Sequence, residues 1–136
     1  MSSNLKYSNG TRDAQQNGLI SYAGSGCLIN IYEGTQPANA NTAISTQTKL
    51  VSLPIAGSFG TDSNGTITIG SVTSAQAVAT GTAQFFRIFK SDGTTVVMDG
   101  SVGTSDADMI LNNTSIAITQ TVTITSGTII RANQWQ

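Results

Sequence analysis

Hydrophobic positions in the second half of the chain follow the two-residue period of β-strands. Residues 83–90 and 95–99 are rich in aromatic and β-branched side chains, and a short Ser-Asp-Gly-Thr turn joins them. Gly93 can adopt the positive φ that such a tight turn requires. The segment therefore predicts a β-hairpin. Both faces of its first strand carry large side chains, with Phe86 and Ile88 on one face and Phe85, Arg87 and Phe89 on the other.

Residues 115–124 alternate most regularly and predict one long strand. Isoleucine and valine point to one side of this strand and threonine points to the other: Ile116, Ile118, Val122 and Ile124 against Thr119, Thr121 and Thr123. One face is therefore expected to meet a core. The threonine face carries hydroxyl groups in place of charges, so a neighbouring protein can cover it at a low cost in desolvation.

Further strands are expected along the rest of the chain. Residues 27–33 place Cys27, Ile29 and Ile31 on one face and Leu28, Asn30 and Tyr32 on the opposite face. Shorter strands are expected at residues 49–55, 66–72, 75–80, 109–111 and 128–131, with a turn cluster at the end of 56–65 and a loop at 101–106. About eight short strands spaced roughly ten residues apart are typical of a sandwich or a small barrel. The chain is therefore predicted to be all-β.

The N-terminal part of the chain differs from the rest. Residues 1–10 are polar and are predicted to form an arm, and residues 11–23 are predicted to form a short helix. Thr11 is the expected N-cap of this helix. We therefore expect an arm and a short helix over residues 1–23, followed by a single β-sandwich domain over residues 24–136.

Composition narrows the function classes further. The chain has 136 residues, of which 38% are hydrophobic and only 10% are charged, well below the usual share of about a quarter. Its formal net charge is -1 and its basic residues are scattered, so we expect no nucleic-acid partner. No apolar run has the length of a membrane span, and the N-terminus lacks the apolar core of a signal peptide. We therefore expect synthesis in a cytoplasm and no membrane partner.

The residue types that usually carry catalysis are missing. The sequence has no histidine, which excludes imidazole acid–base chemistry and the usual zinc sites. Cys27 is the single cysteine, and without a histidine base it is expected to be a plain buried thiol. Asp106 and Asp108, with Asp92 and Asp99 nearby in the sequence, could supply calcium ligands, but EF-hand spacing is absent and solvated turn carboxylates are the preferred interpretation. We predict no enzyme activity, no cofactor and no metal site.

Two groups of residues are candidates for contact with another protein. A strand that is apolar on both faces is either central to a sandwich or pressed against a second chain, which makes Phe85, Arg87 and Phe89 one group. The other group lies near the two termini and comprises Leu5, Lys6, Tyr7 and Trp135. For Trp135, packing onto its own domain is the alternative.

Several stretches resemble small β-rich virion proteins of tailed bacteriophages. One is residues 24–43, where a strand precedes the loop Gly34-Thr-Gln-Pro37 and a run of Ala and Asn. The others are residues 79–94, 99–113 and 120–129. Together they cover most of the chain after residue 24. The resemblance implies a compact, jelly-roll-like antiparallel sandwich that works as a dimer or trimer, and it brings no catalytic residues.

The function implied by the resemblance is structural. Cement or decoration proteins bind the surface of an assembled phage capsid and stabilise it by their binding free energy. The expected partners are the major capsid protein and further copies of this chain, and the expected location is the capsid surface of the virion. Deletion of residues 1–10 is expected to weaken capsid binding and to leave the fold intact. The alternative is a tail or fibre component that binds host surface glycan through Asn- and Thr-rich loops.

Overall fold

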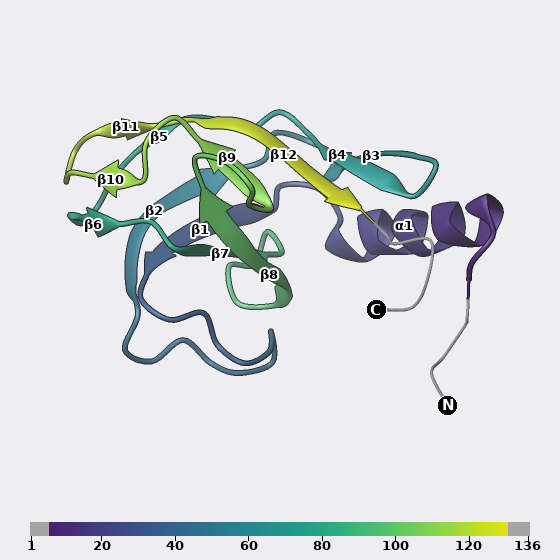
Figure 1. Cartoon of the computed structure of the whole chain (residues 1–136), viewed down its shortest axis with the longest axis horizontal. Helices are drawn as coiled ribbons and strands as arrows, with labels where there is room; N and C mark the ends of the chain where they lie inside the picture. Colours follow the sequence, from purple (N-terminus) through teal and green to yellow (C-terminus); the bar gives the residue numbers. More distant parts are fainter. Residues whose placement is uncertain (1–5, 131–136) are drawn as a thin grey trace.

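The computed structural model describes residues 6–130, with side chains as far as residue 124 (Figure 1). One helix, α1 (Asn9–Ala23), precedes a series of strands. The longer strands are β1 (Leu28–Glu33), β2 (Thr48–Pro54), β3 (Gly60–Ser63), β4 (Thr66–Ile69), β7 (Phe85–Phe89), β8 (Val96–Gly103), β9 (Met109–Leu111) and β12 (Ile124–Ile130). Strands of two residues lie between them: β5 (Ala75–Gln76), β6 (Gly81–Thr82), β10 (Ser115–Ile116) and β11 (Thr121–Val122). The described chain is therefore mostly strands with one helix.

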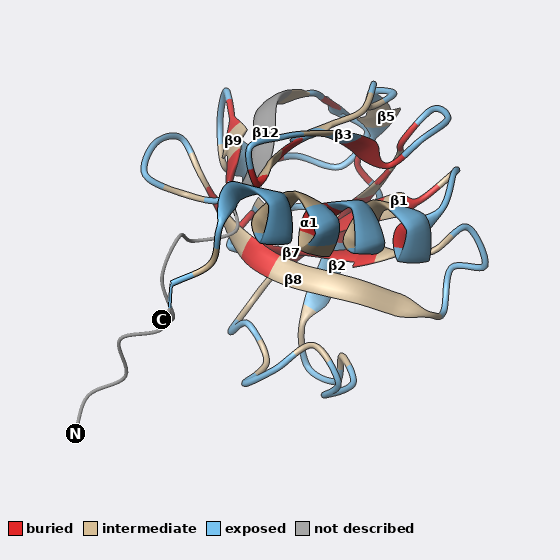
Figure 2. Cartoon of the chain, turned by 90° about the vertical axis from the view of Figure 1, so that its right-hand side faces the viewer, coloured by how far each residue is buried: buried red, intermediate tan, exposed pale blue. Residues whose placement is uncertain are grey.

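The longer strands form one curled, mixed sheet in the order β2-β1-β7-β8-β9-β12-β4-β3. All neighbouring pairs are antiparallel except β8 and β9, which are parallel. The curl stacks the two halves of the sheet as two layers, and α1 lies in front of both in the view of Figure 2. The prediction of a purely antiparallel sandwich is therefore wrong at the β8–β9 step. The two layers belong to one hydrogen-bonded sheet.

The core lies between the two layers, where Figure 2 places the buried segments. One cluster combines Ile29 and Ile31 of the first layer with Ile67 and Met109 of the second. The predicted inward face of β1 is confirmed, because Cys27, Ile29 and Ile31 have no exposed surface. Each fully buried aliphatic side chain stabilises the fold by roughly 1.5–3 kcal/mol, so the contact between layers is a main source of stability.

The predicted hairpin forms from β7 and β8. Gly93 has a φ of 74°, and its amide donates a hydrogen bond to the carbonyl of Lys90 at 2.9 Å. β8 is longer than predicted and includes residues 101–103, which the sequence pattern assigned to a loop. Gly100 pairs with Phe86 across the ladder, and a Cβ at Gly100 would overlap the Phe86 ring. The absence of a side chain therefore lets the aromatic ring cross the neighbouring strand.

The strand predicted from Thr66 is confirmed as β4, and it forms a second hairpin with β3, which lies in the segment 56–65 where only a turn cluster was predicted. Its turn consists of Asn64 and Gly65, with φ values of 52° and 83°, and Ser63 pairs with Thr66. Two consecutive positive φ values are typical of a type I′ turn, for which Asn-Gly is a preferred sequence. The Asn-Gly pair is the signal that could have identified this hairpin.

The long strand predicted over residues 115–124 is wrong, because the chain turns in its middle. β10 ends at Ile116, a turn follows, and β11 begins at Thr121. β10 pairs with β6 and β11 pairs with β5, so the two halves of the predicted strand join different ladders. Ile118, which the alternation assigned to the core face, is 56% exposed at this turn.

The predicted N-terminal helix is confirmed, with a different first residue. α1 begins at Asn9, and the Ser8 side chain is its N-cap, accepting a hydrogen bond from the amide of Thr11 at 3.1 Å. Thr11 is therefore not the cap. The helix ends at Gly24, whose φ is 75° and whose amide donates to the Ile20 carbonyl at 3.0 Å.

Side chains of α1 hold the turn of the β3–β4 hairpin. Gln16 Nε2 donates to the Gly65 carbonyl at 2.7 Å, and the Gly65 amide donates to Asp13 Oδ1 at 2.8 Å. Asp62 of β3 also hydrogen-bonds to the Asp13 carboxyl. Burial, followed by this hydrogen bond between carboxyl groups, raises the pKa of Asp62 above its ordinary value of 3.8. The helix is thus attached to the hairpin turn beside the Asp62 carboxyl, whose protonated form the fold favours.

Asp62→Asn is expected to stabilise the protein at pH 7 and to lose this advantage below about pH 4. A carboxyl whose pKa is raised by folding stabilises the fold in its protonated form. This contribution is complete below the unfolded pKa and is lost as pH rises through the folded pKa. The amide imitates the protonated carboxyl at every pH. Urea unfolding of the variant and the unmodified protein at pH 7 and pH 3 measures the difference.

Asp92→Asn is the matched control with the opposite sign. The Asp92 carboxylate accepts hydrogen bonds from the Thr95 hydroxyl and from the amides of Thr95 and Thr94, and these bonds lower its pKa to about 2. Its contribution is present at pH 7 and is lost as pH falls through about 2, so this amide should destabilise the protein at pH 7. An Asp62→Asn variant that is no more stable than the unmodified protein at pH 7 would contradict the raised pKa of Asp62.

The parallel β8–β9 pair joins the two layers through a connection of residues 104–108. Parallel neighbours usually need a connection of a dozen or more residues. Here the amide and hydroxyl of Ser101 donate to Asp108 Oδ2 at 2.9 and 3.1 Å, and the Asp108 amide donates to Ser101 Oγ at 3.0 Å. Asp106 reverses the chain between them with a φ of 50°. These hydrogen bonds fix the point where the sheet passes from one layer to the other.

Asp108→Ala is expected to lower the free energy of unfolding by about 1–3 kcal/mol, because it removes hydrogen bonds to a charged acceptor. Urea unfolding at pH 7 measures the loss. Asp106→Asn is the control, because it removes a carboxylate from the same connection and asparagine tolerates a positive φ. Equal losses in the two variants would refute the role assigned to Asp108.

Candidate interaction surface

The structure does not bring the predicted contact residues together on one surface. In the terminal group, Leu5 and Trp135 lie outside the described residues. Lys6 is exposed and Tyr7 is partly buried, and both precede α1 directly. The arm predicted over residues 1–10 therefore includes the cap and the first residues of the helix.

The hairpin group lies largely inside the protein. Phe85 is 1% exposed and Arg87 is 2% exposed, while Phe89 is partly buried. The Phe85 ring stacks on the Tyr32 ring of β1, with centroids 5.1 Å apart and planes inclined by 15°. As a correction to the sequence analysis, Phe85 and Arg87 are covered within this chain and are not available to a second one.

Arg87 is held by an ion pair on this face of the sheet. Its Nε and Nη2 atoms donate to Asp99 Oδ1 and Oδ2 at 2.6 and 2.8 Å, and the two side chains are 2% and 5% exposed. The hydrogen bond to Asp99 raises the pKa of Arg87, which keeps the guanidinium charged despite its burial. Asn30, Arg87 and Asp99 are paired positions on β1, β7 and β8, so they form one polar row across three strands.

Asp99→Ala is expected to lower the free energy of unfolding by about 3–5 kcal/mol, because it leaves a buried guanidinium without its carboxylate. The double variant Arg87→Met/Asp99→Leu removes both charges and should recover most of that loss. Urea unfolding at pH 7 compares the two. A double variant that is no more stable than Asp99→Ala would show that the unpaired charge is not the cause.

The available surface lies at the end of the molecule opposite α1, where Figure 1 places β5, β6, β10 and β11. We call this region the uncharged end. The chain carries no charged side chain between Asp62 and Arg87, or between Asp108 and Arg131. Glu33 of β1 reaches its border, where the carboxylate accepts a hydrogen bond from the Thr82 amide at 2.9 Å.

Exposed aliphatic side chains gather in the segments of the uncharged end. Of the three large hydrophobic residues that are exposed within the described structure, two lie here: Val78 at 59% and Ile118 at 56%. Hydrogen bonds bring their segments side by side, since Thr119 N donates to Ala77 O at 2.9 Å and Ala77 N donates to Gln120 O at 2.8 Å. The uncharged end therefore combines exposed aliphatic side chains with uncharged polar side chains.

The turn of residues 117–120 carries Ile118 at its tip and is conformationally strained. Thr119 has a φ of 71°, which β-branched residues rarely adopt and which costs roughly 1–2 kcal/mol. The Gln120 amide donates to the Ala117 carbonyl at 3.0 Å, and the Ile118 amide donates to Thr80 Oγ1 at 2.9 Å. Strained residues often lie at functional sites. Sequence reasoning missed this turn because Ala-Ile-Thr-Gln contains no glycine, proline, asparagine or aspartate.

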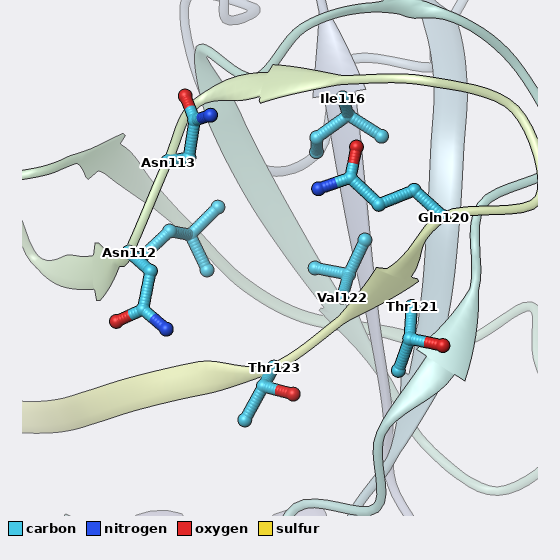
Figure 3. A pocket seen from close by; sticks show the side chains of 8 residues that line it. Asn112, Asn113, Ile116, Gln120, Thr121, Val122 and Thr123 are labelled. Carbon is cyan, nitrogen blue, oxygen red and sulfur yellow. The ribbon is translucent and has the colours of Figure 1, made fainter.

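A polar pocket of about 110 Å³ lies beside this turn (Figure 3). Its apolar lining is buried and consists of Leu111, Ile116 and Val122. Its polar lining is exposed and consists of Asn112, Asn113, Gln120, Thr121 and Thr123. The pocket is thus assembled from the end of β9, from β10 and from both sides of β11, and none of its lining residues is charged.

The structure also places the cysteine and the aspartates that were considered for catalysis or metal binding. The Cys27 thiol is buried, donates to the Ala23 carbonyl at 3.2 Å, and has its pKa raised by burial. Within residues 6–130, no group of three or more His, Cys, Asp or Glu side chains is arranged to hold a metal ion. Asp108, one of the calcium candidates, is engaged with Ser101. The described helix α1 is not long and apolar enough to cross a membrane.

Comparison with known proteins finds no matching family model, no similar curated protein and no similar solved structure.

Proposed function

We propose that the protein is a structural protein of a tailed-bacteriophage particle, a cement or decoration protein that binds the assembled capsid. The observation that supports this function is the uncharged end, with Val78 and Ile118 exposed among threonine, serine and amide side chains. The centre of a protein interface is depleted of charge, because charged groups are costly to desolvate. Apart from Glu33 and Lys49 at its border, this surface can therefore be covered by a partner without burying a charge.

The proposed mechanism is stabilisation by mass action. A subunit that binds the assembled shell and not its separated parts shifts the equilibrium toward the shell by its binding free energy. The proposed partners are the major capsid protein and further copies of this chain, as a dimer or trimer on the capsid surface of the virion. Many copies of an interface of about 1,600 Å² would add up without any strong single contact.

The jelly-roll-like sandwich implied by the resemblance is part of this proposal. The stacking of the two sheet halves around one core supports it. The parallel β8–β9 step is a departure from that plan, because it continues the same hydrogen-bonded sheet from one layer into the other.

The double variant Val78→Asp/Ile118→Asp is expected to lower the affinity for purified phage heads by about tenfold or more, because it places charges in the proposed contact. Cosedimentation of the protein with heads stripped of it measures the affinity. Tyr22→Asp is the matched control, since Tyr22 is 53% exposed on α1, which is not part of the uncharged end. Binding that is weakened by Tyr22→Asp and unchanged in the double variant would place the contact elsewhere.

Deletion of residues 1–7 tests the N-terminal contact separately. The originally expected deletion of residues 1–10 would also remove the Ser8 cap and the start of α1, which confuses lost contact with lost fold. The shorter deletion keeps the cap. Reduced occupancy on heads, with unchanged urea unfolding, is the result expected if this arm contacts the capsid.

A further inference from the structure

The pocket of Figure 3 presents hydrogen-bond donors in a fixed direction. Asn113 Oδ1 accepts a hydrogen bond from the Ser115 amide at 2.9 Å, and Gln120 Oε1 accepts one from the Ala117 amide at 2.9 Å. Each side-chain carbonyl is therefore held by a backbone N–H, which determines the orientation of the amide group. The two NH₂ groups face the pocket from opposite sides (Figure 3) and donate no hydrogen bond within the described residues.

The strained turn of residues 117–120 fixes the orientation of one of these two donors, the NH₂ group of Gln120. Gln120 ends the turn of residues 117–120, and both its backbone amide and its side-chain oxygen bond to Ala117. Thr119 precedes it in the left-handed conformation. The side chain of Gln120 is therefore positioned before any ligand arrives, which lowers the entropy that binding would cost.

The remaining lining combines hydroxyl groups with an apolar floor. The Thr121 hydroxyl makes no hydrogen bond within the described residues, whereas the Thr123 hydroxyl bonds to Ser74 at 2.9 Å. Ile116 and Val122 are buried beneath the polar rim, 2% and 5% exposed. A ligand in this pocket would meet donors at its sides and aliphatic carbon below.

This arrangement selects among ligand classes. An anion would find no cationic side chain in the lining, and a cation would find no carboxylate. A wholly apolar ligand would bury two NH₂ groups without acceptors, which costs roughly 1–3 kcal/mol for each group. A sugar ring has uncharged oxygen acceptors around its edge and carbon-bound hydrogens on its face, and both match the lining.

We propose that the pocket lined by Asn113, Ile116, Gln120, Thr121 and Val122 binds a neutral saccharide. The NH₂ groups of Asn113 and Gln120 donate to oxygen atoms of one sugar residue, and the C–H face of that sugar packs on Ile116 and Val122. The small volume of about 110 Å³ admits part of one ring, so the rest of the saccharide lies along the exposed rim. This site shares the uncharged end with the proposed capsid contact, because Gln120 ends the turn that carries Ile118, so a bound saccharide and the capsid would compete for this surface.

Titration of the ¹⁵N-labelled full chain with neutral trisaccharides of N-acetylglucosamine, glucose and mannose tests the proposal. At least one of them is expected to shift the side-chain NH₂ signals of Asn113 and Gln120 in a saturable manner, with little dependence on salt. Heparin fragments and a neutral tripeptide of alanine and threonine are the comparison probes. Shifts with none of the neutral saccharides, or with the tripeptide or heparin alone, would overturn the saccharide site.

The variant Gln120→Glu tests the NH₂ group of Gln120 as a donor without disturbing the fold. The glutamate keeps an oxygen that can accept from the Ala117 amide and loses the NH₂ group, so affinity for the active saccharide should fall about tenfold or more. Gln84→Glu is the matched control, because Gln84 Oε1 also accepts from a backbone amide, that of Gly34 at 2.6 Å, outside the pocket. Gln120→Glu binding with unchanged affinity, in a protein whose backbone spectrum is otherwise intact, would refute the proposal.

Discussion

The structure depends on the hydrogen bonds between Ser101 and Asp108, because they close the short parallel step from one layer to the next. The strands on the far side of β8 in the long sheet are placed by that step. β9 receives β12 as its other neighbour, and β12 in turn receives the β3–β4 hairpin. A different geometry at residues 104–108 would move the second layer away from Ile29 and Ile31 and open the core. The local contact thus controls long-range packing, across a connection much shorter than parallel neighbours usually need.

The central strand β7 is buried on both faces, and this decides where the protein can meet a partner. One face contributes Phe86 and Ile88 to the core between the layers. The other contains the Arg87–Asp99 pair and the stacked Tyr32 and Phe85 rings. A buried ion pair often contributes little net stability, but an unpaired member is strongly destabilising, so the two residues constrain each other's position. The hairpin that dominates the sequence pattern is therefore structural, and contact surfaces must be sought elsewhere.

The sequence predicted those features that depend on local pattern. The β7–β8 hairpin and the inward face of β1 followed from alternation and from Gly93. The N-terminal helix followed from a capping signal at its start, although the cap is Ser8 and not Thr11. For the β3–β4 hairpin, the turn cluster and the strand from Thr66 were predicted, and β3 was missed because its residues are short and polar.

The candidate site was not predictable in the same way. Ile116, Ile118 and Val122 alternate as they would in one strand, yet tertiary hydrogen bonds to residues 77 and 80 force a turn at Thr119. The polar pocket exists only because of that turn. Likewise, no local pattern states that β8 and β9 run parallel, since strand pairing is set by contacts distant in sequence.

The edges of the sheet explain why side chains, and not backbone, are left to make contacts in the described structure. β3 lies beside α1, whose Asp13 and Gln16 bond to the hairpin turn. β2 is bordered by residues 72–78, because Thr73 N donates to Pro54 O at 2.9 Å and Val78 N donates to Leu50 O at 2.7 Å. Covered edges discourage the addition of a foreign strand. The proposed association at the uncharged end would then rest on aliphatic burial and neutral hydrogen bonds, which salt screens far less than it screens charge pairs.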